Sequence, residues 1–155
     1  MGVNMKKMIY DELFTDTDVN TGEDIFYVDS TLEKPYTGVV VDYFKGVLSW
    51  EFEVQDGFRT GIERKYYDTG ELMEENETNH NTIDGMAKEF YKNGNIKSIS
   101  IAIRNIFIDT ISFDESGSIV SRTSMSDSDS SYCLVENKVG EYREKYKLEE
   151  WKNRG

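Results

Sequence analysis

The segments Tyr66-Tyr67-Asp68-Thr69-Gly70-Glu71-Leu72 and Phe90-Tyr91-Lys92-Asn93-Gly94-Asn95-Ile96 repeat one pattern: an aromatic pair, a polar turn, a glycine and an aliphatic residue. Weaker copies of the pattern precede and follow them. As a result, four glycines stand 24, 24 and 23 residues apart: Gly46, Gly70, Gly94 and Gly117. A period of this length is typical of repeat proteins, whose units stack on one another rather than close around a pocket.

Each unit predicts a β-hairpin. Short runs of aromatic and β-branched residues flank polar turns, and the four glycines are expected to supply the positive φ that a tight reversal needs. From Gly61 onward, aromatic and charged residues fall on both faces of an extended chain. The predicted fold is therefore mainly β, an elongated single-layer antiparallel meander of repeated hairpins, wetted on both sides. The alternative, a sandwich of two sheets, would need a cleaner alternation of apolar and polar residues.

One aliphatic column repeats strictly through the four units: Leu48, Leu72, Ile96 and Ile119. We expect this column to be the buried spine of the sheet, with each member contributing about 1.5–3 kcal/mol where fully buried. The third unit carries a second apolar stripe, Ile99, Ile101 and Ile103. A second glycine opens the first three units, at Gly38, Gly61 and Gly85, whereas the fourth unit has Ile108 there and is either a decayed repeat or a terminal cap.

The composition divides the chain into four parts. Residues 1–24 form an N-terminal segment, and residues 25–122 form the repeat domain, which begins with a shortened hairpin around Ile25-Phe26-Tyr27-Val28. Residues 123–131 form an acidic, serine-rich linker. Residues 132–155 form a C-terminal cap, with a strand at Tyr132-Cys133-Leu134-Val135 and a short helix within residues 137–153. This helix either covers the last open edge of the sheet or is a solvated tail.

The charge of the chain restricts its partners. It has 30 acidic and 18 basic residues, for a formal net charge of −12. Such a surface repels nucleic-acid phosphates and anionic membranes, and it attracts basic proteins. Acidity that serves solubility alone is the other explanation. With one cysteine, no secretory signal and no membrane span, the sequence favours a cytoplasmic location.

Catalytic and metal chemistry find little support. The only histidine is His80, the only cysteine is Cys133, and neither lies in the context of a known nucleophile, so we expect no enzyme, no catalytic residues and no cofactor. The segment 16–22 begins like an EF-hand calcium loop. Its glycine, however, comes at the seventh position and Tyr27 stands where the bidentate glutamate belongs, so a polar loop without metal is preferred.

The repeated pattern, opened by Pro35-Tyr36-Thr37-Gly38, resembles the bacterial MORN-repeat variant of YwqK-family antitoxin proteins over residues 25–122. The resemblance implies a MORN-like meander and a non-catalytic role as an immunity protein that neutralises a cognate toxin domain, for example a nuclease or deaminase. It carries over no functional residues, because the shared motif is a folding motif. Residues 123–155 lie outside the pattern and are where partner specificity could reside.

The predicted partner is therefore a protein, a basic toxin domain, with no nucleic acid and no membrane. Four aromatic residues are candidate anchors of that interface, since Trp and Tyr are favoured at binding hot spots: Tyr43, Trp50, Tyr67 and Tyr91. For each of them the alternative role is a rung between neighbouring strands. The alternative function is a general MORN-type scaffold for protein or membrane surfaces. The sequence leaves the oligomeric state open.

Overall fold

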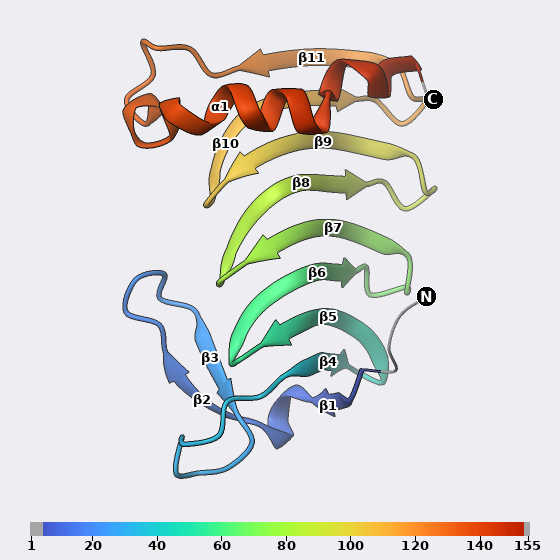
Figure 1. Ribbon diagram of the computed structural model, residues 1–155. Coiled ribbons are helices and arrows are strands. Elements are labelled where there is room, and N and C mark those ends of the chain that lie inside the picture. The colour runs from blue at the N-terminus through green and yellow to red at the C-terminus, as the bar shows by residue number, and fades with distance from the viewer. Residues whose placement is uncertain (1–4, 154–155) are drawn as a thin grey trace.

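The computed structural model describes residues 5–153, so the first and last residues of the predicted N-terminal segment and cap, 1–4 and 154–155, lie outside it. One sheet holds nine of the strands, in the order β1-β4-β5-β6-β7-β8-β9-β10-β11 (Figure 1). Its antiparallel meander comprises β4 (Gly38–Phe44), β5 (Val47–Gln55), β6 (Phe58–Tyr66), β7 (Leu72–Asn79), β8 (Thr82–Phe90), β9 (Ile96–Ile103), β10 (Ile106–Phe113) and β11 (Ile119–Ser124). The predicted mainly β meander of hairpins, with a C-terminal helix, is confirmed.

Two kinds of turn alternate along the meander. On one margin, Gly70 (φ 100°), Gly94 and Gly117 close longer turns, in the first of which the Tyr67 N–H donates to Glu71 O at 2.8 Å, whereas Gly46 closes a two-residue turn with Lys45. On the other margin, two residues with positive φ suffice, as in His80-Asn81 (48° and 68°). The Asn81 side chain also accepts the Arg59 backbone N–H (2.8 Å), while the backbone N–H of Asn81 donates to Arg59 O (2.9 Å), which ties this hairpin to the one before.

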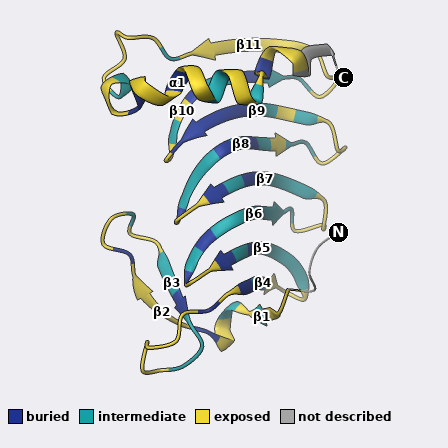
Figure 2. Cartoon of the chain, in the orientation of Figure 1, coloured by how far each residue is buried: buried dark blue, intermediate teal, exposed yellow. Residues whose placement is uncertain are grey.

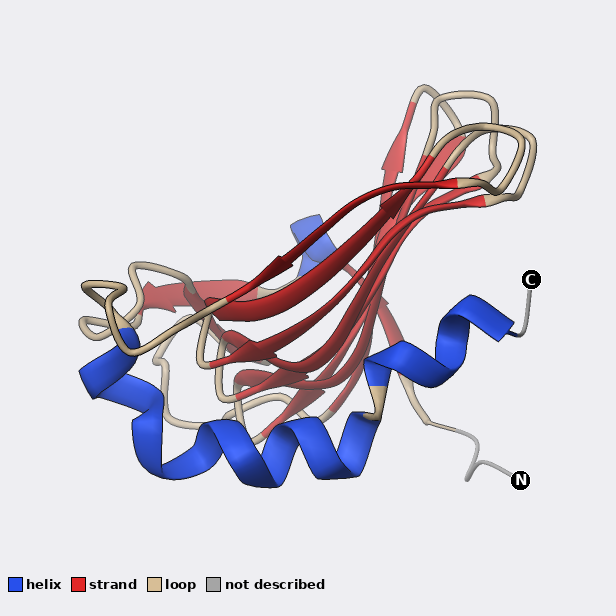
Figure 3. Cartoon of the chain, turned by 90° about the horizontal axis from the view of Figure 1, so that it is seen from above, coloured by secondary structure: helices blue, strands red, loops and turns tan. Residues whose placement is uncertain are grey.

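The glycines that open the repeats have a steric reason. Gly85 has φ 125°, and a Cβ there would overlap the Glu77 carboxylate and lie 2.7 Å from the Tyr146 hydroxyl. The carboxylate occupies this space because its Oε2 accepts the Met86 N–H at 2.6 Å. Gly61 repeats the arrangement one hairpin earlier, with Glu53. These positions lie beside register shifts in the ladders, which increase the twist and contribute to the curvature that Figure 3 shows.

Other elements pack at the two ends of the sheet. At the N-terminal end, β1 (Lys7–Ile9) pairs in parallel with β4, a short 3₁₀ turn follows (η1, Tyr10–Glu12), and β2 (Phe14–Thr17) pairs with β3 (Asp24–Tyr27) as a separate ribbon. At the C-terminal end, α1 (Tyr132–Tyr146) and the 3₁₀ turn η2 (Leu148–Asn153) run along one face of the sheet (Figure 3). The helices within residues 5–153 are too short or too polar to cross a bilayer.

The buried apolar side chains form two clusters, one toward each end of the sheet. Figure 2 colours the residues by burial and shows the long buried stretch of β9. The N-terminal cluster consists of Leu13, Phe26, Tyr36, Val40, Phe52 and Val54. The C-terminal cluster consists of Ile99, Ile101, Ile103, Ile108, Ile111, Val135, Val139 and Leu148. The two faces of the sheet are therefore not wetted evenly, because α1 covers β9 and the N-terminal elements cover Phe52 and Val54.

The predicted buried spine is wrong. Leu48, Leu72 and Ile96 are only partly buried, and Ile119 is exposed. These residues lie where strands begin, beside the glycine turns. The elements that exclude water pack further along the strands, so the second stripe of the third unit, Ile99 to Ile103, becomes the core instead.

The shortened first hairpin is present in irregular form: Val28 donates to Lys34 O at 3.0 Å, Tyr36 donates to Phe26 O at 2.9 Å, and a single antiparallel bridge joins Tyr27 to Pro35. Its strand, β3, also pairs with β2, which the sequence did not predict.

Two further expectations are corrected. Residues Tyr132–Val135 form the first turn of α1 and not a strand. The helix is neither an edge cover nor a solvated tail, because its Val135 and Val139 pack against the isoleucines of the sheet face.

Candidate protein-interaction surface

Two of the predicted aromatic anchors connect one hairpin to the next through a hydrogen bond. The Tyr67 hydroxyl donates to Phe90 O at 2.6 Å, and the Tyr91 hydroxyl donates to Phe113 O at 2.8 Å, one repeat further on. A lysine ammonium lies over each ring, 5.4 Å from the centre of Tyr67 and 5.8 Å from that of Tyr91. Both tyrosines are thus engaged in the cross-strand role that was their alternative.

The other two anchors differ from these and from each other. Trp50 belongs to the N-terminal end, where its Nε1 donates to Glu63 Oε2 at 3.0 Å and its ring centre lies 4.4 Å from that of Phe52. Tyr43 precedes the first turn of the meander and is 52% exposed. The four residues do not form one patch: three tyrosines follow one margin of the sheet and Trp50 lies apart. Their role in binding stays a prediction.

The rungs give a first testable prediction. Tyr67→Phe should lower the free energy of unfolding by about 0.5–1.5 kcal/mol, because Phe90 O loses its hydroxyl donor. Tyr43→Phe is the matched control, since no hydrogen bond of the Tyr43 hydroxyl is found within the described chain, and it should change stability by less than about 0.5 kcal/mol. Urea denaturation of both variants measures the difference. Equal losses of stability in the two variants would mean that the Tyr67–Phe90 hydrogen bond does not stabilise the sheet.

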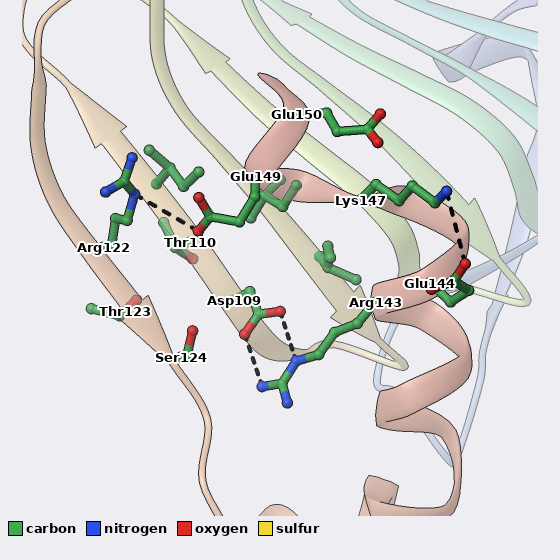
Figure 4. Close-up of a pocket in the computed structure, with 13 residues that line it drawn as sticks. Asp109, Thr110, Arg122, Thr123, Ser124, Arg143, Glu144, Lys147, Glu149 and Glu150 are labelled. Atoms are coloured by element: carbon green, nitrogen blue, oxygen red, sulfur yellow. Dashed lines mark hydrogen bonds and ion pairs between the residues drawn. The ribbon is translucent and has the colours of Figure 1, made fainter. Parts of the chain in front are cut away.

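A hollow of about 540 Å³ lies between β10, β11 and the C-terminal helices (Figure 4). Arg143 crosses it and donates twice to the Asp109 carboxylate, at 2.9 Å each, and once to Met125 O. The hydrogen bonds to Asp109 raise the pKa of Arg143 above its usual value. The other two cations pair as well: Arg122 with Glu149 and Lys147 with Glu144, both at 3.8 Å.

The charged side chains that line this hollow thus pair with one another. Its lining contains no histidine or cysteine, and the Arg143–Asp109 pair joins α1 to β10. The ion pair across the hollow therefore holds the helix against the sheet.

The single histidine and the single cysteine lie elsewhere, each beside a local partner. His80 stacks on Phe58 with ring centres 3.8 Å apart. The Cys133 thiol lies 3.9 Å from Ser130 O.

The calcium-like segment 16–22 is the turn of the β2–β3 ribbon. Asp18 is buried there and accepts the Asn20 N–H at 3.0 Å and the Thr21 hydroxyl at 2.8 Å. These bonds lower the pKa of the Asp18 carboxyl. Asn81 donates to the same carboxylate at 3.3 Å, which links the ribbon to the meander. Across the part of the chain that the structure describes, no three potential ligand side chains from His, Cys, Asp or Glu gather to hold a metal.

The middle of the sheet presents an open surface on the face that α1 covers further along. Two adjoining hollows of about 350 and 230 Å³ meet at Ile62 and run from β1 to the end of α1. We call this surface the central groove. Its lining residues are Lys7, Val39, Glu51, Phe52, Glu53, Ile62, Arg64, Glu75, Asn76, Glu77, Met86, Lys88 and Tyr146.

A ladder of alternating charge crosses the central groove. Arg64 donates to Glu75 at 2.9 Å and lies 3.7 Å from Glu51, while Lys88 lies 3.8 Å from Glu75 on its other side. Tyr66 donates to Glu51 at 2.6 Å, and burial together with this hydrogen bond raises its pKa to about 12. The ladder fixes the side chains on a broad surface. Such an arrangement suits recognition of another protein's charges.

Sequence reasoning did not identify this ladder. Its members are direct neighbours in the strand register, Glu51 beside Arg64, Arg64 beside Glu75 and Glu75 beside Lys88. The signal in the sequence is a carboxylate and a cation repeated across consecutive hairpins. It becomes visible only once both turns of each hairpin are placed, because a shift of one residue moves every side chain to the other face.

Comparison with known families agrees with this architecture. Residues 59–80 and 83–101 match the family described as MORN repeat variant. The matched stretches are the β6–β7 hairpin and most of the β8–β9 hairpin, which carry much of the central groove. Comparison with curated proteins and with solved structures finds no significant match. The chain thus contains MORN repeat variants in two stretches, and these support a general protein-interaction module built of repeats.

Proposed function

We propose that the chain is a non-catalytic protein-binding module and, more specifically, an immunity protein that neutralises a basic toxin domain. The observation that carries the proposal is the central groove: a broad, open sheet surface with its charges fixed in a ladder. A preorganised surface of this kind loses little conformational entropy when a protein binds to it. The net charge of −12 favours a basic partner and speeds its encounter.

The toxin partner is inferred from the resemblance of the repeats to those of YwqK-family antitoxins. A toxin domain that acts on nucleic acid carries a positive groove for phosphates, and an acidic protein seated there would block its substrate. This mechanism needs no reacting group on the immunity protein. It requires only complementary charge and an interface of ordinary size.

The test is inhibition of the toxin domain encoded beside this chain's gene. Purified chain should bind that domain and abolish its activity at equimolar ratio, and the association rate should fall as salt rises, since the encounter is steered by charge. Co-expression should restore growth to cells that produce the toxin. Failure to bind, or binding that leaves the toxin active, would overturn the immunity function.

A general MORN-type scaffold is the second candidate, and the match to the repeat family favours it. A scaffold would bind a partner that is not a toxin, or a membrane surface. Flotation with neutral and anionic liposomes tests the membrane version. We expect no binding to either, because an anionic surface repels a chain of this charge. Flotation with anionic liposomes alone would favour the scaffold.

A further inference from the structure

The outer strand of the N-terminal ribbon, β2, has an open edge. It is paired on one side only, with β3, and all four of its residues are exposed. In Figure 1 the ribbon lies beside the N-terminal strands of the large sheet, with β2 on its outer side. β3 in contrast is flanked on both sides, because Phe26 donates to Gly57 O and accepts from the Tyr36 N–H, both at 2.9 Å.

The same two bonds show where the β2 backbone points. Phe26 faces Thr15 in the register, and both its backbone groups are turned away from β2. Thr15 and Phe26 are therefore a non-hydrogen-bonded pair, and the N–H and C=O of Thr15 point outward. Within residues 5–153, the structure places no backbone partner on them. Two residues further along β2, the Thr17 N–H donates to Oδ1 of its neighbour Asp16 at 2.8 Å.

This edge is protected only by its short length and by one carboxylate, that of Asp16. Natural proteins guard open edges with very short strands, charged side chains (lysine above all), proline, a bulge or a cover. β2 has the sequence Phe14-Thr15-Asp16-Thr17, with no lysine and no proline, and the Phe14 ring is 44% exposed. A short strand of this composition can accept a third strand through its backbone and offer Phe14 as an apolar contact.

The charge around the edge selects the occupant. Residues 8–33 contain eight carboxylates and no lysine, arginine or histidine, so they carry eight of the twelve excess negative charges of the chain. Among the described residues, Glu23 alone of the eight forms an ion pair, with Arg59 at 3.4 Å. A second copy of this strand would bring acid against acid. The open edge of the large sheet at β11, in contrast, contains Arg122 and no acidic residue.

We propose that β2 is a docking strand for an extended, basic segment of a partner protein, which adds to the ribbon as a third strand. The partner's backbone bonds to Thr15, and its lysine or arginine side chains meet Asp16 and the carboxylates of the adjoining turns. The inference deepens the proposed function, on which it rests for the partner's being a basic protein. It places part of the interface on a strand outside the repeats.

The probe is a short end-blocked peptide of alternating lysine and valine, with an alternating glutamate and valine peptide as its counterpart. The lysine peptide should slow amide hydrogen exchange at Thr15, and the glutamate peptide should not. Thr15→Pro removes the outward N–H without touching the β2–β3 ladder, and should weaken binding about tenfold. Asp16→Lys should weaken it by a similar factor, more at low salt than at high salt.

Two matched variants separate the edge from other causes. Ser124→Pro puts the same residue on β11, where the Met125 N–H bonds inward to Ile108 O and the Ser124 N–H points outward. Asp68→Lys, on an exposed turn of the meander, changes the net charge as Asp16→Lys does. Neither should alter peptide binding. Equal weakening by the matched variants, or exchange protection absent from Thr15, would overturn the docking strand.

The neighbouring toxin domain distinguishes the two proposals. If the toxin is inhibited equally well by the Thr15→Pro and Asp16→Lys variants, and the lysine peptide does not protect Thr15, the docking strand is wrong and the immunity function stands. If the peptide protects Thr15 but the toxin does not bind the wild-type chain, the docking strand stands and the toxin assignment is wrong.

Discussion

Replacing Arg59 by methionine should lower the free energy of unfolding by about 3–5 kcal/mol, because it leaves the Glu63 carboxylate buried without its cation. Glu63 is 2% exposed and Arg59 is 9% exposed. Arg59 donates to Glu63 at 2.6 Å, and the same carboxylate accepts from Trp50 at 3.0 Å and from Asn76 at 3.3 Å. Two neutral donors remain in the variant, and they cannot replace a full charge.

A second substitution tests the cause. Arg59→Met with Glu63→Met removes both charges and keeps apolar volume beside Trp50 and Phe52, so it should recover a large part of the loss. Arg64→Met is the control on the surface, where the cation is partly exposed and pairs with Glu75; it should cost about 1 kcal/mol or less. Urea denaturation of the four proteins provides the comparison. If Arg59→Met costs no more than Arg64→Met, the buried pair does not stabilise the fold as argued.

The period of the chain was enough to predict the meander. A glycine turn every two dozen residues, flanked by strand-forming residues, is a local signal, and local signals survive whatever packs around them. The turns at His80-Asn81 and Arg104-Asn105 were harder to recognise because asparagine takes the place of the usual glycine. Their side chains bond to the preceding hairpin, and no pattern within one hairpin reveals such a bond.

The core could not be predicted from the repeats, because the elements that bury it lie outside them. Leu48 and its equivalents repeat strictly and yet are only partly buried or, at Ile119, exposed, while the isoleucines of β9 are buried by α1. The same holds for the candidate surface. The central groove depends on where α1 stops and β1 begins, and the charge ladder depends on a register shared by four strands.

The largest packing effect is expected at Ile101, in the middle of the C-terminal cluster. It is 1% exposed and lies in β9, beneath the face that α1 covers. Ile101→Ala should lower the free energy of unfolding by about 2–5 kcal/mol. The variant loses the packing contacts of the side chain and also leaves a cavity, which the sheet and the helix cannot fill by moving together. The helix should loosen with it, and amide exchange in α1 should become faster.

Ile119 provides the matched control, because it is the same residue in the column that the sequence marks as the spine. It is 38% exposed in β11, so Ile119→Ala should change stability by about 0.5 kcal/mol or less. Thermal and urea unfolding of the two variants show which set of aliphatic residues stabilises the sheet more, the stripe of Ile101 or the column of Ile119. A large loss at Ile119 with a small loss at Ile101 would mean that the strictly repeated column, and not the helix-covered stripe, stabilises the sheet.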